Sequence, residues 1–208
     1  MQKRDYLIFG ITFLIIEILV ILRNTLLSYN YYFWFCDFAP LLLAIGFFLK
    51  KDDLIKATIN FGLLTQLIFL IWYLNNIIQG IFIQGRILFN MIIIVLTILA
   101  HASSILALIF TRKIKSSIKT IYWTIGVILG VWIITLAFTN PSENINILHK
   151  IPQEIYFYLP FQKFLWPPIV FLIFALPAHY IQVWIYKLSK DKTKGIKKRI
   201  KESIKTKN

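Results

Sequence analysis

The chain has 208 residues, of which 58% are hydrophobic and only 15% are charged, whereas a soluble domain is about 45–50% hydrophobic and about 25% charged. Its 23 basic and 9 acidic residues give a formal net charge of +14, which in a soluble domain would suggest nucleic-acid binding. The mean hydropathy of +0.71 excludes that interpretation and favours a membrane protein.

Six apolar stretches qualify as transmembrane helices, since about 20 helical residues cross a hydrocarbon core of about 30 Å. In chain order they are Tyr6–Leu22, Tyr31–Leu49, Leu54–Leu74, Ile87–Thr111, Lys119–Thr139 and Phe164–Tyr186. They lack the period-two alternation of membrane strands. The sequence therefore predicts an all-α polytopic membrane bundle in one domain, with six transmembrane helices in residues 1–186 and a basic tail in residues 187–208.

Basic residues are concentrated in alternate connections of this bundle. If the N-terminus is cytoplasmic, 19 of the 23 Lys and Arg residues fall on the cytoplasmic side, and the outer side keeps Arg23, Arg86, Lys150 and Lys163. Because basic loops stay in the cytoplasm, we predict a multi-pass protein of the cell membrane with both termini cytoplasmic.

Four polar residues from four of these spans form the predicted site. Glu17, Cys36, Gln66 and His101 fall about 15–20 Å from the predicted cytoplasmic ends, at 1.5 Å per residue. Such residues are costly at membrane depth and need a partner, a wet cavity or a function. Two bland interpretations stay open, because polar side chains can simply join helices and Cys36 can be a small buried hydrophobe.

Further candidates lie outside this layer. His179 follows Pro177 in the last span and forms a second polar patch nearer the cytoplasm. Asn144 and Asn146 lie in the longest connection, which is either a solvated loop or folds back over the outer mouth. With a single cysteine and histidines in different layers, we predict no metal site and no cofactor.

The tail from Lys187 onward has ten basic residues against Asp191 and Glu202. Such a segment is attracted to anionic lipid headgroups by about 1 kcal/mol per basic residue. The alternative is a disordered tail that only enforces topology. Nucleic acid is not an expected partner, since no aromatic residue for base stacking follows Tyr186, and a homo-oligomer is left open.

The order of short motifs resembles a family of uncharacterised multi-pass bacterial membrane proteins. The matching segments are Trp34-Phe-Cys36-Asp-Phe-Ala-Pro, Gln66, His101, Asn140-Pro-Ser-Glu-Asn144-Ile-Asn146 and Leu176-Pro-Ala-His179. More distantly, the helix order of Glu17, Cys36, Gln66 and His101 is similar to the group that includes YwaF and transmembrane protein 164. That resemblance implies intramembrane acyl transfer by a cysteine and a histidine.

These observations lead first to an integral membrane protein whose midplane polar site binds or acts on lipid. One alternative is an intramembrane acyltransferase or lipid hydrolase. In that enzyme Cys36 attacks an acyl ester, His101 is the base, and Gln66 or the Asn144 and Asn146 loop stabilises the oxyanion. A small-solute transporter and a non-catalytic scaffold are further alternatives.

Overall fold

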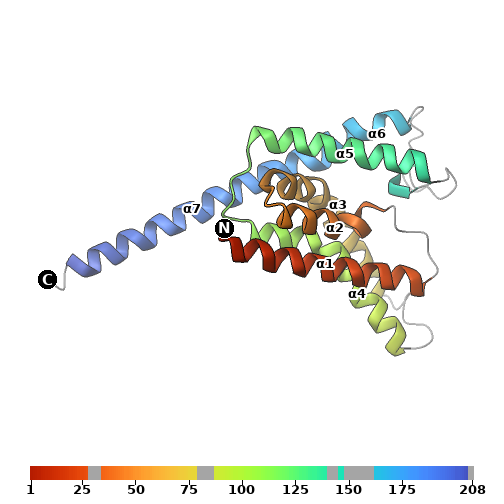
Figure 1. The fold of residues 1–208 in the computed structure, drawn as a ribbon, viewed down its shortest axis with the longest axis horizontal. Helices are drawn as coiled ribbons and strands as arrows, with labels where there is room; N and C mark the ends of the chain where they lie inside the picture. Colours follow the sequence, from red (N-terminus) through yellow and green to blue (C-terminus); the bar gives the residue numbers. More distant parts are fainter. Residues whose placement is uncertain (28–33, 79–86, 140–144, 148–161, 206–208) are drawn as a thin grey trace.

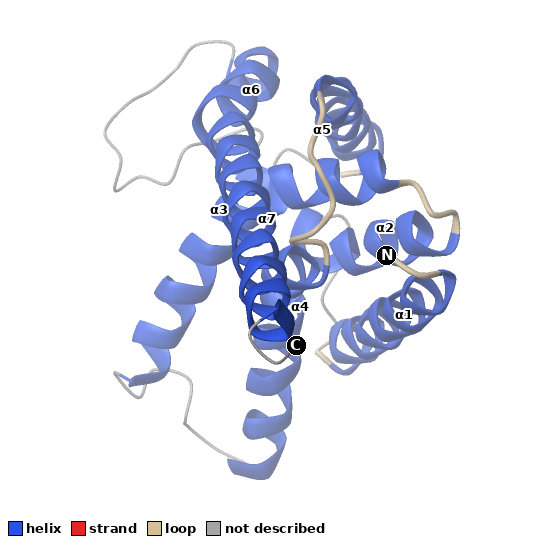
Figure 2. Cartoon of the chain, turned by 90° about the vertical axis from the view of Figure 1, so that its left-hand side faces the viewer, coloured by secondary structure: helices blue, strands red, loops and turns tan. Residues whose placement is uncertain are grey.

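The computed structural model covers the chain and describes residues 1–27, 34–78, 87–139, 145–147 and 162–205. Every regular element in these ranges is helical (Figures 1 and 2). The elements are α1 (Lys3–Leu26), α2 (Phe35–Phe48), α3 (Asp52–Ile78), α4 (Ile87–Phe110), α5 (Ile118–Phe138), a short 3-10 turn η2 (Ile145–Ile147), α6 (Gln162–Val170), a π-helical segment η3 (Phe171–Ala175) and α7 (Leu176–Lys205). The all-helical prediction is thus confirmed.

Five helical segments are long and apolar enough to cross a membrane: Lys3–Leu26, Asp52–Ile78, Met91–Phe110, Ile118–Phe138 and Lys163–Asp191. They overlap five of the predicted spans, and they are compatible with an integral membrane protein. These continuous apolar runs form helices because a helix satisfies all its backbone hydrogen bonds internally where no water is present.

The second predicted span is shorter than expected. Helix α2 has 14 residues and is about 21 Å long at 1.5 Å per residue, whereas Tyr31–Leu49 would have spanned the hydrocarbon core. It begins at Phe35, after the extended backbone of Trp34. Residues 31–33 lie outside the described residues. The first turn of α2, with Cys36 and Asp37, therefore lies alongside the longer neighbouring helices and not beyond their ends.

The last span is one helical path in three segments. Proline lacks a backbone N–H and interrupts α-helical hydrogen bonding, and Pro167, Pro168 and Pro177 all lie in this path. Between them, η3 adopts π geometry, in which the amide of Leu176 donates to the carbonyl of Phe171. Helix α7 then continues to Lys205. Figure 1 shows both chain ends at the same end of the bundle, with α7 projecting beyond it.

Helix α3 occupies the centre and packs against α2, α4, α5 and α7. On one side, α1, α2, α3, α4 and α7 share an apolar core that includes Phe13, Leu43, Phe47 and Ile59, all fully buried. On the other side, a second core joins the start of α2 to α3, α5 and α6 through Phe35, Phe61, Ile128 and Trp166. We call the end at which α1 ends and α2 begins the far end, and the opposite one the terminal end.

Candidate functional site

An ion pair links α1 to α2 in the half of the bundle towards the far end. Arg23 Nη2 donates to Asp37 Oδ2 over 2.7 Å, and the two residues are each 4% exposed. Asn24 accepts from Arg23 and donates to the same Asp37 oxygen at 3.0 Å. Arg23 Nη1 also donates to Thr97 Oγ1 on α4 at 3.3 Å. The charges therefore compensate each other within one network across three helices.

The sequence did not place Arg23 in the site, because its charge was assigned to the outer surface. A signal was nevertheless present. Asp37 sits inside an apolar run, and a carboxylate at membrane depth needs a cation or a wet cavity. Arg23 is the basic residue on the preceding helix nearest to the turn that leads to Asp37.

Cys36 lies against this ion pair. Its thiol points towards Asp37 Oδ1, with 3.8 Å between sulfur and oxygen, and part of its surface stays exposed. The structure thus places the Cys36 thiol beside the Arg23–Asp37 pair, with a carboxylate oxygen as its hydrogen-bond acceptor.

His101 is held on two sides. Its ring stacks on Phe69 of α3, with the ring centres 3.9 Å apart and the planes within 14°. Nδ1 lies 2.8 Å from the carbonyl oxygen of Thr97. A carbonyl can only accept, so Nδ1 carries the proton and Nε2 keeps its lone pair. Among the described residues, Nε2 has no partner although His101 is only 3% exposed.

Glu17 is the second buried ionisable group with a free polar atom. It lies on the core face of α1, is 6% exposed and approaches the backbone of Leu41 on α2. Its Oε2 atom makes no hydrogen bond in the part of the chain that the structure describes. The phenylalanine pair Phe13–Phe110 and the Arg23–Thr97 bond fix the α1–α4 register. That register places Glu17 and His101 within about one helical turn of the same height.

Gln66 joins α3 to α4. Its side-chain oxygen accepts the Ser104 amide at 3.0 Å, and the side-chain amide exchanges hydrogen bonds with Ser103 Oγ. Gly62 allows this close approach, because a β-carbon there would overlap Ser104 Oγ. This is the geometry of helix joining.

The predicted second patch forms a separate cluster between α3, α5 and α7. Asn60 Nδ2 donates to Thr124 Oγ1 at 2.8 Å and lies 3.5 Å from His179 Nδ1. Gln182 donates to Asn60 Oδ1 and to the Lys56 carbonyl. Lys56 in turn is 1% exposed and donates through Nζ to the Thr111 carbonyl at 2.9 Å, where the carbonyls at the end of α4 favour a cation.

Asn146, in the described part of the outer connection, forms hydrogen bonds to α2, α5 and α6. Its Oδ1 accepts the Phe35 amide at 2.8 Å, its Nδ2 donates to Thr135 Oγ1 at 2.9 Å, and its carbonyl accepts Trp166 Nε1 at 2.8 Å. The side chain thereby ties the start of α2 to α5. Asn144 lies outside the described residues.

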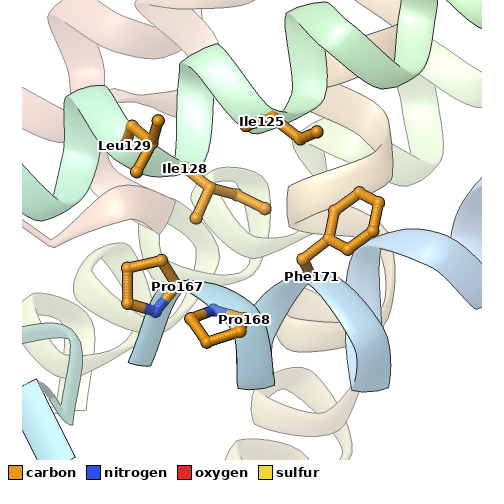
Figure 3. A pocket seen from close by; sticks show the side chains of 6 residues that line it. All are labelled: Ile125, Ile128, Leu129, Pro167, Pro168 and Phe171. Atoms are coloured by element: carbon orange, nitrogen blue, oxygen red, sulfur yellow. The ribbon is translucent and has the colours of Figure 1, made fainter. Parts of the chain in front are cut away.

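A small pocket lies between α5 and the path of α6 and η3 (Figure 3). Its volume is about 190 Å³. Its lining is entirely apolar: Ile125, Ile128 and Leu129 from α5 lie across from Pro167, Pro168 and Phe171. No polar group there could orient a substrate, so the candidate site is the one around Arg23, Asp37 and His101.

Within the described ranges, no three His, Cys, Asp or Glu side chains come together as metal ligands would. Comparisons with models of known protein families, with curated proteins and with solved structures gave no match. The function must therefore be argued from this geometry.

Proposed function

We propose that this is an integral membrane protein that binds the polar group of a lipid, or a small solute of the same chemistry, at the site between α1, α2 and α4. One observation carries the proposal. Glu17 and His101 are almost completely buried, yet each keeps one polar atom without a partner. A buried polar atom without a hydrogen bond costs about 1–3 kcal/mol. Among the described residues, Glu17 and His101 are the two buried ionisable groups with such an atom, and this supports a ligand at their site.

The chemistry of the two atoms defines the ligand class. His101 Nε2 can only accept a hydrogen bond, because the ring proton is on Nδ1. Glu17 Oε2 accepts a hydrogen bond as a carboxylate oxygen and donates one only when protonated, and the Arg23–Asp37 pair next to them is internally neutral. The ligand should therefore carry hydrogen-bond donors, such as a hydroxyl or a primary ammonium group.

For the orientation, we propose six membrane helices with both termini in the cytoplasm. Both chain ends lie at the same end of the bundle, which is what an even number of crossings requires. The Lys and Arg distribution supports the cytoplasm for that end. In this arrangement the shorter α2 would be the second crossing.

The test compares lipids that share a phosphate but differ in donors. Purified protein is reconstituted with phosphatidylethanolamine, phosphatidylglycerol or phosphatidylcholine, and its Tm is measured. Binding to the folded state raises Tm, so we expect the ethanolamine or the glycerol lipid to raise Tm by about 3 °C or more over the choline lipid. Free ethanolamine and free glycerol, added to protein in phosphatidylcholine, distinguish a small solute from a lipid. Equal Tm values in all conditions would refute the proposal.

Variants locate the effect. His101→Phe keeps the stacking on Phe69 but removes Nε2, and Glu17→Met removes the free carboxylate oxygen. We expect both to abolish the Tm difference between lipids. His179→Phe is the matched control, because that histidine belongs to the cluster with Asn60, and it should keep the difference.

A second candidate, acyl transfer at Cys36, is favoured by one further observation. The thiol contacts Asp37, and His101 is linked to Arg23 through Thr97, which bonds to both. Nε2 is the basic atom of the His101 ring. In this reaction sulfur bonds to the acyl carbon as the ester C–O bond breaks. His101 carries the thiol proton to the leaving alcohol. The distant resemblance noted above implies the same chemistry.

Intact-protein mass after incubation with phospholipid tests this second candidate. A covalent acyl thioester would add one fatty acyl group to the wild-type chain and none to Cys36→Ala. An unmodified wild-type mass, together with unchanged phospholipid, would leave binding as the function and remove acyl transfer.

A further inference from the structure

The apolar pocket beside α5 has a buried floor and exposed rims. We call it the α5–α6 groove, and its lining consists of Ile125, Ile128, Leu129, Pro167, Pro168 and Phe171 (Figure 3). Ile128 on the floor is 1% exposed, whereas Ile125 and Leu129 on one rim are 38% and 40% exposed. Pro168 on the opposite rim is exposed as well. The groove is therefore accessible from outside the bundle.

The groove lies at the depth of lipid chains. Both of its walls belong to segments that are long and apolar enough to cross a membrane. Helix α5 begins at Ile118, so Ile125 and Leu129 lie about 10–17 Å along it at 1.5 Å per residue. Half of the hydrocarbon core of a bilayer is about 15 Å. In a membrane the groove thus faces the hydrocarbon chains of lipids.

The groove is narrow, and one of its walls is stiff. Pro167 and Pro168 have a fixed backbone φ, and Phe171 begins the π-helical segment η3, a geometry that is frequent at functional sites. The volume of the groove is about 190 Å³. A helix with its side chains is about 10–12 Å wide and is too large to enter, whereas an unbranched acyl chain is thin enough.

A cation lies about one helical turn from the groove, towards the far end, where α6 begins (Figure 1). Lys163 is exposed and precedes Pro167 by four residues. Its carbonyl accepts Trp132 Nε1 at 2.6 Å, and Trp132 follows the rim residue Leu129 by three residues on α5. Lys163 Nζ lies 5.2 Å from the centre of the Phe164 ring. In the described part of the chain no carboxylate forms an ion pair with it.

From this arrangement we infer that the α5–α6 groove binds one acyl chain of an anionic phospholipid whose phosphate lies at Lys163. The ammonium group attracts a negative headgroup. Phe171 lies about 12 Å further along the helical path than Lys163 at 1.5 Å per residue, so an acyl chain that starts at the headgroup passes the whole groove within one leaflet. This inference uses the membrane embedding proposed above, but it does not depend on the site at Glu17 and His101.

A photoactivatable phosphatidylglycerol with a diazirine in one acyl chain tests the site. The full-length protein is placed in vesicles of phosphatidylcholine or of unlabelled phosphatidylglycerol, each with the same low fraction of the probe. A surface that does not select lipids is labelled equally in both. We expect the groove peptides to be labelled about fivefold less in phosphatidylglycerol, where unlabelled lipid competes for the one cation. The exposed face of α1 at Ile15 and Ile18 should be labelled equally.

Variants locate the lipid. Lys163→Gln removes the cation, so groove labelling in phosphatidylcholine should fall about fivefold, to the level seen in phosphatidylglycerol. Leu129→Trp fills the groove and should lower groove labelling in both kinds of vesicle. Leu165→Trp is the matched control, because Leu165 is also 40% exposed but does not line the groove. It should keep the wild-type pattern.

Equal groove labelling of the wild-type protein in the two kinds of vesicle would overturn the inference, as would a Lys163→Gln protein that keeps the difference. Absence of groove labelling while α1 is labelled would also overturn it, because a second copy of the chain would then cover this surface. His101→Phe and Glu17→Met should leave groove labelling unchanged. Failure of this inference and failure of the proposed function are therefore distinguishable.

Discussion

Arg23 on α1 and Asp37 on α2 form a 2.7 Å ion pair with both side chains almost fully buried. Removing one partner of such a pair leaves an uncompensated charge and costs about 3–5 kcal/mol, whereas replacing both by apolar residues is often neutral. We therefore expect Arg23→Met and Asp37→Leu each to lower Tm sharply, and the double variant to recover most of the loss. Thermal unfolding of the four proteins measures this. Additive losses in the double variant would mean that the two charges do not depend on each other.

Substitution by alanine should have opposite effects on stability at Gly62 and at Gly126. A β-carbon at Gly62 would overlap Ser104 Oγ, while one at Gly126 meets nothing within 4 Å. Overpacking a buried contact costs about 1–3 kcal/mol, and alanine is favoured over glycine in a helix by up to about 1 kcal/mol. Gly62→Ala should thus lower Tm and Gly126→Ala should hold or raise it. A thermal scan in one detergent compares them, and a stable Gly62→Ala protein would contradict the close α3–α4 approach.

Asn146 contributes side-chain hydrogen bonds and also has an unusual backbone conformation. Its φ of 54° and ψ of 22° lie in the left-handed region, which costs a non-glycine residue about 1–2 kcal/mol. Asn146→Gly should lose the bonds to Phe35 and Thr135 but relieve the backbone, whereas Asn146→Ala keeps the strain. We expect Tm to fall in both, and further in the alanine variant. The reverse order would show that the backbone conformation carries no cost.

Asp53 anchors the start of α5. Its Oδ1 atom accepts Ser117 Oγ at 3.1 Å and Thr120 Oγ1 at 2.7 Å. Asp53→Ala leaves both hydroxyls without this acceptor, so we expect a loss of about 1–3 kcal/mol. Asp53→Asn keeps an acceptor oxygen and should lose less. Hydrogen exchange of the first turn of α5 provides the local measurement, and equal exchange in the two variants would argue against the anchor.

Much of the helical framework follows from the sequence, because crossing an apolar medium constrains both length and composition. The predicted Lys119–Thr139 and the observed Ile118–Phe138 differ by one residue at each end. The start of α2 was missed, since hydropathy does not respond to the chain turning within an apolar stretch. Only the structure shows that Trp34 precedes the helix in extended backbone.

Some residues of the candidate site could likewise be identified from the sequence, and others only from the structure. Glu17, Cys36 and His101 could be selected from the sequence, because each is a polar residue in an apolar run. Arg23 could not, since a basic residue near a helix end is usually assigned to the surface, and only the spatial approach of Asp37 explains its burial. The role of Asn146 also depends on contacts with α2 and α5 that no local pattern encodes.

The continuity of α7 has a mechanical consequence. Leu176–Lys205 is a single helix of 30 residues, about 45 Å long, and its first turns are attached to α3 through His179 and Gln182. From that attachment to Lys205 the helix extends about 35–39 Å, so a tilt of about 10° there would move its other end by about 6–7 Å. Small rearrangements among the buried amides would thus appear, several times amplified, as displacement of the basic end of the chain.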